Sequence, residues 1–429
     1  FLDLSECFEL SSSPQSIGVF QYVAENPLPL HVTLVGELSK NQIYSDLKTC
    51  FAISTNTSVL SYLRNAAEYS YSRSPYLAQL FYSILLKDLT GFHMKSSKNK
   101  DSNQPLEKEN DQMRSIFITP TASVNAAFQH SSIKGNDYSI DEQTIRFDYG
   151  ENELNCPDDL KISILESFTR QSMELEEYDP KQVIKHFVSQ RFGLRHGDQM
   201  YYGNGVAPLF AALSKKINAE DGTILIPQGA YGYFYGTAQF HNVKIQIIPT
   251  DEENAFLPTA TSLKEALRGI RNPWLFLNFP LVNPTGACWT NDLLRSLLEI
   301  DEIQDTKIII DTVFSGLEFN GPGSFPILTE KEDDLNYVLL GGISKEYSAG
   351  GIRFGYALSN FCSDLSPAIN YVPHKTVLHA VKKIYSKYLD ADQRVLHALI
   401  RRARQRRDGS RDVGTDVDNA GLRQNIQID

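Results

Sequence analysis

The sequence lacks the features that mark membrane, zinc-finger and disulfide-rich proteins. Its 429 residues include only five cysteines, which stand far apart and form no Cys-X-X-Cys pair or His/Cys cluster. This spacing excludes a disulfide scaffold and a structural zinc site and favours a reducing compartment, so we expect a cytoplasmic protein. The nine histidines are also scattered, so we expect no metal site. No run of about 18 apolar residues is present, so we expect no membrane-spanning segment.

The charge balance excludes most nucleic-acid and membrane-surface binders. The formal net charge is -11, and an acidic chain is repelled by phosphate backbones and by anionic lipids. One exception is a cluster of five arginines between residues 401 and 407, which precedes a segment without apolar periodicity. We interpret residues 396–429 as a solvated helix end and a basic, disordered tail. We therefore expect neither nucleic acid nor a membrane as a partner.

Composition divides the chain into a front piece and a longer back piece. Residues 95–114 are polar, mixed in charge and poor in apolar side chains, which is typical of a linker or a mobile loop. We therefore expect a front piece at 1–92, a linker at 93–140 and a larger domain at 141–395. The chain starts at Phe1 without a signal sequence, so we expect a fragment that begins inside a strand of a longer protein.

The back piece alternates short apolar runs with amphipathic segments. This pattern predicts an α/β fold whose mainly parallel sheet is covered by helices on both faces. Ligands of such sheets bind beyond the carboxyl ends of the strands. We expect strands within 223–228, 244–250, 274–280, 307–314 and 337–344, and helices within 206–217, 262–270 and 291–300.

Four chemically suggestive residues follow successive strands of this predicted sheet. They are Asn283 in an Asn-Pro-Thr-Gly turn, Asp311, Lys345 and Arg353. Each residue alone has a bland explanation as a turn, a helix cap or a solvated charge, but the ordered set matches the needs of pyridoxal phosphate. That cofactor requires an amine for its aldehyde, a buried carboxylate for its ring nitrogen, an amide for its phenolic oxygen and a guanidinium for its phosphate.

Two further segments supply the remaining contacts that such a cofactor needs. Gly205, Val206 and Ala207 open the helix predicted at 206–217, where free backbone N–H groups can hold a phosphate. The segment 227–235 offers an aromatic ring to stack on the cofactor. Tyr231 is the first candidate and Tyr233 the alternative.

Three motifs in the back piece resemble those of the class I and II aminotransferases, the fold-type I pyridoxal-phosphate enzymes. They are NPTG at 283–286, DTVFSGLEF at 311–319 and GISKEYSAGGIRFG at 342–355. The resemblance covers residues 145 to about 389. It implies a three-layer sandwich with an incomplete small domain and an amino-acid substrate. By the same resemblance, Lys345 carries the cofactor, Asp311 pairs with its ring nitrogen, Asn283 binds its phenolic oxygen and Arg353 its phosphate.

The sequence departs from this family at three places. Phe314 stands where the family often has a tyrosine, and Gly342 stands where a serine is common. Val206 and Ala207 take the place of a hydroxyl-bearing residue in the glycine loop. We also identify no arginine for a substrate carboxylate in the segment that follows Lys345.

The front piece resembles a region of longer plant methyltransferases that precedes an aminotransferase-like part. The segments FLDLSECFEL and KNQIYSDLKTCFAI carry this resemblance. It implies that S-adenosylmethionine is bound by a domain outside this chain, because the nearest glycine-rich string, GNGVAP at 203–208, lies where a phosphate loop belongs. Three interpretations stay open. They are a scaffolding or regulatory part of such a methyltransferase, an active aminotransferase, and a degenerate fold that binds an amino acid without a cofactor.

The front piece also repeats part of the back piece. The segment Gly36–Lys40 parallels Gly341–Lys345, and Lys48 follows Lys40 at the same distance as Arg353 follows Lys345. Asp3 would then correspond to Asp311. We therefore predict that residues 1–92 are the back half of a first aminotransferase-like unit. The two units would form a pseudo-dimer within one chain, or the chain would form a homo-oligomer.

Overall fold

The computed structural model describes most of the back piece and parts of the front piece. The described residues are 2–3, 33–37, 50–54, 56–66, 156, 161–162, 166–167, 178–318, 325–366, 369 and 372–390. The predicted linker at 93–140, the tail at 396–429, and Lys40 and Lys48 lie outside these ranges.

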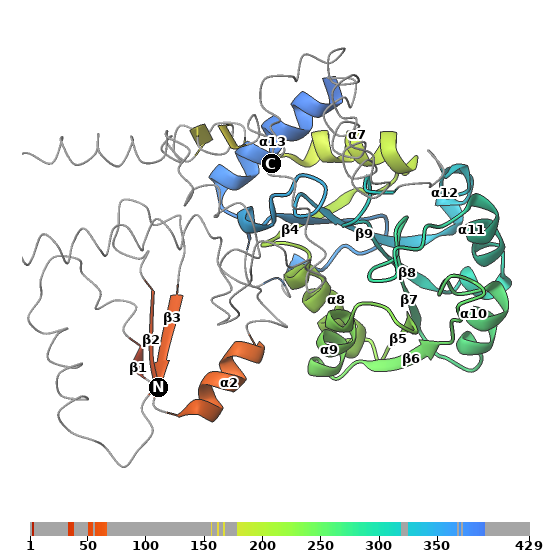
Figure 1. Ribbon diagram of the computed structural model, residues 1–429, viewed down its shortest axis with the longest axis horizontal. Helices are drawn as coiled ribbons and strands as arrows, with labels where there is room; N and C mark the ends of the chain where they lie inside the picture. The colour runs from red at the N-terminus through yellow and green to blue at the C-terminus, as the bar shows by residue number, and fades with distance from the viewer. Residues whose placement is uncertain are drawn as a thin grey trace, which may run out of the picture.

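A seven-stranded sheet forms the centre of the back piece (Figure 1). Its strands lie side by side in the order β4-β10-β9-β8-β7-β5-β6. Neighbours from β9 to β6 run parallel, whereas β10 runs antiparallel to both β9 and β4. This arrangement confirms the α/β fold with a mainly parallel sheet. The strands are β4 (Gln199–Gly203), β5 (Thr223–Pro227), β6 (Lys244–Ile248), β7 (Pro273–Asn278), β8 (Lys307–Asp311), β9 (Asn336–Gly342) and β10 (Gly355–Ser359).

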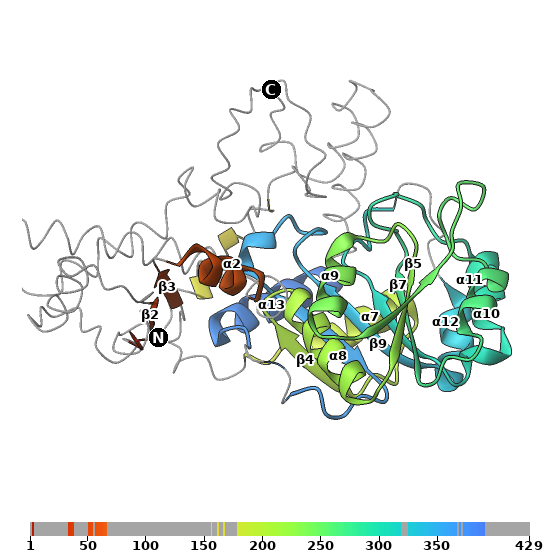
Figure 2. The ribbon, with the colours of Figure 1, turned by 90° about the horizontal axis from the view of Figure 1, so that it is seen from below.

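Helices cover both faces of the sheet and create two separate cores. Figure 2, seen from below, shows α8 (Ala207–Ala219) and α9 (Gly232–Phe240) in front of the strands. Successive residues of one strand enter opposite cores: Leu275 packs with the helices of one face and Phe276 with α8 and α9 on the other. The first face holds α7 (Lys181–Phe192), α10 (Ala260–Leu267), α11 (Asn291–Leu298), α12 (Pro326–Glu330) and α13 (Lys375–Asp390).

Local sequence explains where several of these elements begin and how buried they are. Thr259 accepts from the Ser262 backbone N–H and forms a capping box that starts α10. Thr290 caps α11 in the same way by accepting from Leu293 N. The strand β6 lies at the edge of the sheet, so Ile247 stays 39% exposed although the run is apolar. Short 3-10 turns complete this part of the fold: η4 (Asp301–Ile303), η5 (Glu332–Asp334) and η6 (Gly350–Ile352).

A separate three-stranded sheet comes from the front piece. It contains β1 (Leu2–Asp3), β2 (Thr33–Glu37) and β3 (Cys50–Ser54), in the order β1-β2-β3. The strand β1 pairs with β2 in parallel, and β2 pairs with β3 in antiparallel fashion. The helix α2 (Thr57–Ala66) follows β3. Among the described residues, no helix is both long enough and apolar enough to cross a membrane.

Candidate functional site

The carboxyl ends of three parallel strands bring a buried carboxyl group to the edge of the sheet. Asn278 at the end of β7 is the register partner of Asp311 at the end of β8, and Asp311 is the partner of Leu340 in β9. The Asn278 amide donates to Asp311 Oδ2 over 2.7 Å, and the Val313 N–H donates to Oδ1 over 3.2 Å. Burial raises the pKa of Asp311 to about 7, although both donors oppose the shift.

Lys345 lies in the turn that follows β9, next to the end of β8. It is half-buried, and its Nζ lies 5.6 Å from the centroid of the Phe314 ring. The turn is closed by the Ser348 N–H, which donates to the Lys345 carbonyl over 3.3 Å. Ser348 has a positive φ of 50°, a conformation that non-glycine residues adopt rarely and mostly in tight turns. The structure therefore brings Lys345 and Asp311 to neighbouring strand ends, as the sequence predicts.

Arg353 and the glycine loop before α8 meet on the other side of β9. Arg353 Nη2 donates to the Asn204 carbonyl over 3.0 Å, and Nη1 donates to the Gly350 carbonyl over 3.1 Å. Gly205 has a φ of 86°, and a Cβ atom at this position would lie 2.8 Å from Arg353 Nη2. A Cβ at Gly355 would lie 2.5 Å from the Gly205 carbonyl carbon. The glycines thus let the loop approach both the arginine and β10.

Two buried polar side-chain atoms, one in this loop and one in the turn after Lys345, lack a hydrogen-bond partner among the described residues. They are Asn204 Oδ1, within the glycine loop, and Ser348 Oγ, in the turn after Lys345. Both residues are less than 5% exposed. An unsatisfied buried polar atom costs about 1–3 kcal/mol, so a ligand that bonds to it would recover that cost. The N-terminus of α8 begins at Ala207, where backbone N–H groups are free to bind an anion.

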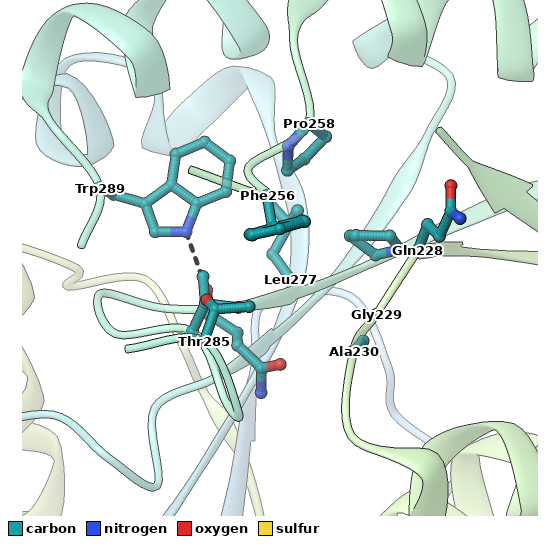
Figure 3. Close-up of a pocket in the computed structure, with 11 residues that line it drawn as sticks. Gln228, Gly229, Ala230, Phe256, Pro258, Leu277, Thr285 and Trp289 are labelled. Carbon is teal, nitrogen blue, oxygen red and sulfur yellow. Dashed lines mark hydrogen bonds between the residues drawn. The ribbon is translucent and has the colours of Figure 1, made fainter. Parts of the chain in front are cut away.

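The Asn-Pro-Thr-Gly turn and the start of α9 border a small pocket (Figure 3). It lies at the carboxyl ends of β5 and β7. Thr285 and Val282 line it from the turn, and Ala230 lines it just before Tyr231. Trp289 closes one side, where its Nε1–H donates to the Asn278 carbonyl over 2.9 Å. The pocket therefore touches the same strand end that supports Asp311.

The predicted aromatic partner and the predicted amide occupy accessible positions. Tyr231 is the N-cap of α9, is 45% exposed and stacks on Tyr233 with a centroid distance of 6.2 Å. Because the two rings stand together, the choice between them stays open. Asn283 is half-buried in a turn closed by the Gly286 N–H, which donates to the Val282 carbonyl over 2.8 Å.

The sequence did not predict the residues that support Asp311 and the Lys345 turn through a hydrogen bond and an ion pair. Asn278 supports Asp311, while Arg191 and Glu346 form a buried ion pair with an N–O distance of 2.6 Å. An asparagine at the end of an apolar strand was visible in the sequence as the Asn278 of WLFLNFP. Nothing in the sequence signals that the charges of Arg191 and Glu346 are buried together, because they lie 155 positions apart.

The presence of glycine rather than a larger residue at position 342 has a steric explanation. A Cβ atom there would lie 2.7 Å from the Phe354 carbonyl oxygen and 3.3 Å from the Gly355 Cα. The strands β9 and β10 approach too closely for any larger residue without a shift of backbone. The departure from the serine common in related enzymes therefore follows from this packing.

The comparisons with known proteins agree with this fold. A family model described as aminotransferase class I and II matches residues 142–413. The chain belongs to this family. A crystal structure of the aspartate aminotransferase from Rhizobium meliloti matches this aminotransferase unit with a TM-score of 0.51 and 20% identity, covering 61% of this chain and 66% of that one. The likeness shows the fold-type I architecture.

The curated relatives are much longer than this chain. Methionine S-methyltransferase of Arabidopsis thaliana is 31% identical over 97% of this chain and 40% of its own length. Methionine S-methyltransferase of Zea mays is 29% identical over 98% of this chain and 39% of its own length. The similarity thus extends through the front piece as well as through the aminotransferase unit.

Proposed function

We propose that the aminotransferase unit binds pyridoxal phosphate at the carboxyl edge of its sheet. The observation that carries this proposal is the state of Asp311. Its carboxyl is buried, its pKa is raised to about 7 by that burial, and its hydrogen-bond donors, Asn278 and Val313, are both neutral. A protonated ring nitrogen beside this carboxyl would provide the compensating positive charge.

The other residues of the edge fit the remaining parts of the same cofactor. Arg353, the free N–H groups of Val206 and Ala207, and the Ser348 hydroxyl can hold a phosphate. Lys345 is half-buried at the adjacent strand end, where its amine can bond to the cofactor aldehyde and later hold a proton. Bound there, the cofactor supplies a ring that withdraws electrons from an amino acid.

We propose that the whole chain is the aminotransferase-like part of a methionine S-methyltransferase. The support is that relatives of this name match nearly the whole chain but only about two fifths of their own length. Methyl transfer from S-adenosylmethionine to methionine would then belong to a part of the protein outside this chain. Within such a protein, the unit would bind an amino acid, regulate or scaffold the enzyme, and occur as a homo-oligomer or a pseudo-dimer.

A second candidate function is amino-group transfer by this unit itself. The observation that favours it is that Lys345, Asp311 and Arg353 are all present and lie at one edge of the sheet. A unit that served only as a scaffold would not need this lysine. The two candidates share the cofactor and differ in whether an amino acid exchanges its amino group there.

The experiment that tests the cofactor proposal is a titration of the purified chain with pyridoxal phosphate, followed by visible absorbance. We expect a saturable absorbance band with the wild type and its loss in Lys345→Ala. A matched control is Lys331→Ala, which changes a lysine that precedes β9 at the opposite edge and should leave the band unchanged. An equal response of wild type and Lys345→Ala would refute the assignment. Addition of an amino acid then separates the two candidates, because only a transferring unit would release an oxo acid.

A further inference from the structure

A buried ion pair lies directly beside the candidate lysine. Arg191, near the end of α7, places Nη1 2.6 Å from Oε1 of Glu346, the residue after Lys345. The Glu346 side chain is 4% exposed and that of Arg191 is 13% exposed. Burial raises the pKa of Glu346, and the Arg191 guanidinium opposes that shift. The pair is therefore a desolvated interaction inside the fold, unlike the surface pairs of the same chain.

The guanidinium of Arg191 joins three elements. Besides Glu346, Nη1 also donates to Ser315 Oγ over 3.3 Å, in the loop that follows Asp311. The guanidinium lies 4.6 Å from the centroid of the Phe187 ring, which fixes it against its own helix. A single side chain thus connects α7, the loop after β8 and the turn after β9.

Lys345 and Phe314, which contact one another, each precede a residue that hydrogen-bonds to Arg191. Lys345 Nζ lies over the ring of Phe314, Phe314 precedes Ser315, and Lys345 precedes Glu346. The close approach depends on Gly316, whose φ is 86° and where a Cβ would lie 3.0 Å from Glu346 Oε1. The loop and the turn are therefore fixed relative to one another at the point where Lys345 lies.

Core stability alone does not account for this pair. Replacing a buried ion pair by apolar residues of similar volume is often neutral or stabilising, because the charges lose their hydration on burial. What the charged pair adds is a fixed geometry, since a guanidinium bonds in defined directions to both Glu346 and Ser315.

We propose that Arg191 and Glu346 are positioning residues that hold Lys345 against the loop that follows β8. The inference deepens the proposed function, because it assumes that Lys345 is the cofactor lysine. Its structural part, the control of the Lys345 turn, can be measured without any cofactor.

The test compares the full-length wild type with the double variant R191M/E346L, which replaces the pair by apolar side chains. The matched control is R295M/E299L, which removes the exposed pairs that Arg295 forms with Glu299 at the end of α11 and with Glu330 at the end of α12. The first readout is the rate at which an amine-reactive acetylating reagent modifies Lys345 in cofactor-free protein, followed by peptide mass spectrometry. The second is the affinity for pyridoxal phosphate, and the third is the melting temperature.

We expect R191M/E346L to keep a melting temperature near that of the wild type. Acetylation of Lys345 should become faster by about tenfold, which corresponds to about 1.4 kcal/mol in the opening of the turn. Cofactor affinity should fall, while R295M/E299L should match the wild type in all three readouts.

Two results separate the possible failures. An unchanged acetylation rate in R191M/E346L would overturn the positioning role. Absence of cofactor binding by the wild type, together with faster acetylation in the variant, would refute the proposed function and leave the control of the turn intact. If R191M/E346L does not fold, R191K serves instead. It keeps the charge but loses the planar guanidinium that directs Nη1 to both Glu346 and Ser315, and it should accelerate acetylation as well.

A second, independent observation concerns the three-stranded sheet of the front piece. Asp3 in β1 is the register partner of Val35 in β2, just as Asp311 in β8 is the partner of Leu340 in β9. In both sheets the first pair is parallel and the second antiparallel. The strands β1, β2 and β3 therefore have the same order and the same directions as β8, β9 and β10.

The antiparallel ladders agree at every paired position. When Gly36 is aligned with Gly341, each partner in β3 corresponds to the partner in β10. The five matched pairs are Thr33–Ser54 with Val338–Ser359, Leu34–Ile53 with Leu339–Leu358, Val35–Ala52 with Leu340–Ala357, Gly36–Phe51 with Gly341–Tyr356, and Glu37–Cys50 with Gly342–Gly355. Both ladders place a glycine opposite an aromatic residue. At Gly341, a Cβ would lie 2.5 Å from the Tyr356 ring, which explains why glycine is needed there.

We infer that β1, β2 and β3 are the counterpart of β8, β9 and β10 in a second aminotransferase-like unit. Chance resemblance of short strands explains a shared order of three strands, but it does not explain a shared register together with identical residues. Asp3, Leu34, Gly36, Ala52 and Ser54 are identical to their counterparts Asp311, Leu339, Gly341, Ala357 and Ser359.

The register can be tested with the native Cys50. Because Glu37 and Cys50 face one another across the ladder, Glu37→Cys in the full chain should form a disulfide with Cys50 under mild oxidation. Gly36→Cys is the matched control. Position 36 is the register partner of Phe51 rather than of Cys50, and successive residues of a strand alternate between its faces, so this variant should not link to Cys50. Peptide mapping identifies the pair. A link from Gly36→Cys, or none from Glu37→Cys, would contradict the repeat.

Discussion

At the scale of single residues, Asp311 is the group whose protonation matters most to the proposed site. The sequence placed this aspartate at a strand end, but it could not show that Asn278 supports it, because the two residues meet only through the pairing of β7 with β8. The buried carboxyl prefers its neutral form, since burial raises its pKa from 3.8 to about 7. A folded state that binds this proton more tightly than the unfolded state is stabilised at low pH.

Asp311→Asn should therefore change how stability depends on pH in the cofactor-free protein. As pH rises from about 4 to about 7, the wild-type free energy of unfolding should fall by up to about 1.4 kcal/mol per pH unit because of this group. The variant lacks the titrating group, so the difference between the two proteins should change with pH across this window and become constant below about pH 4. Urea denaturation at several pH values measures this difference. A difference independent of pH would contradict the buried, neutral carboxyl.

The second prediction at this scale concerns Arg353. Its two terminal nitrogens bond to carbonyls of two different segments, Asn204 and Gly350, which an ammonium group cannot reproduce. We expect Arg353→Lys to weaken binding of pyridoxal phosphate by about tenfold or more, a loss of about 1.4 kcal/mol. Binding of pyridoxal without its phosphate is the control and should change little. Equal losses for both compounds would show that Arg353 does not act through the phosphate.

At the scale of elements, the sequence predicted the strands β5 to β9 and the helices α8, α10 and α11, and it missed β4 and the helices α7 and α9. The apolar runs at β5, β7, β8 and β9 carry their own signal because both of their faces are buried. The strand β4 is short and mixed in polarity, and it is held by its pairing with β10, more than 150 positions further along the chain. Such long-range pairing has no local signature.

The contact between β9 and β10 gives a prediction for Gly342. Restoring the serine common in related enzymes should destabilise the protein by about 1–3 kcal/mol, because the new Cβ would meet the Phe354 carbonyl at 2.7 Å. Gly232→Ser is the control, since no atom lies within 4 Å of a Cβ at that position. Thermal unfolding of both variants measures the effect. A Gly342→Ser protein as stable as the wild type would show that the strands lie further apart than described.

At the scale of the whole molecule, the two cores and the position of the candidate site at the carboxyl edge follow from the parallel sheet of the described aminotransferase unit. The family motifs predicted which edge to inspect, and the structure adds the ion pair and the glycine contacts that hold it. The sequence could not reveal those contacts, because they join α7, β8, β9 and β10 across long separations.

The division of labour proposed for the longer protein predicts that this chain alone does not methylate methionine. Its glycine loop at 203–206 packs against Arg353 and Gly355, where it forms part of the candidate phosphate site. We expect transfer of label from S-adenosylmethionine to methionine by the isolated chain to equal that of a heat-inactivated sample. Transfer above that level would place methyltransferase activity within this chain.

The central claim is that one lysine, at one edge of this sheet, receives the cofactor. The most direct measurement is peptide mapping after incubation of the full chain with substoichiometric pyridoxal phosphate and reduction with borohydride. The account predicts that the reduced label is found on the peptide containing Lys345, and that Lys345→Ala leaves the chain unlabelled under the same conditions. Label distributed over exposed surface lysines, with Lys345 unmodified, would contradict it.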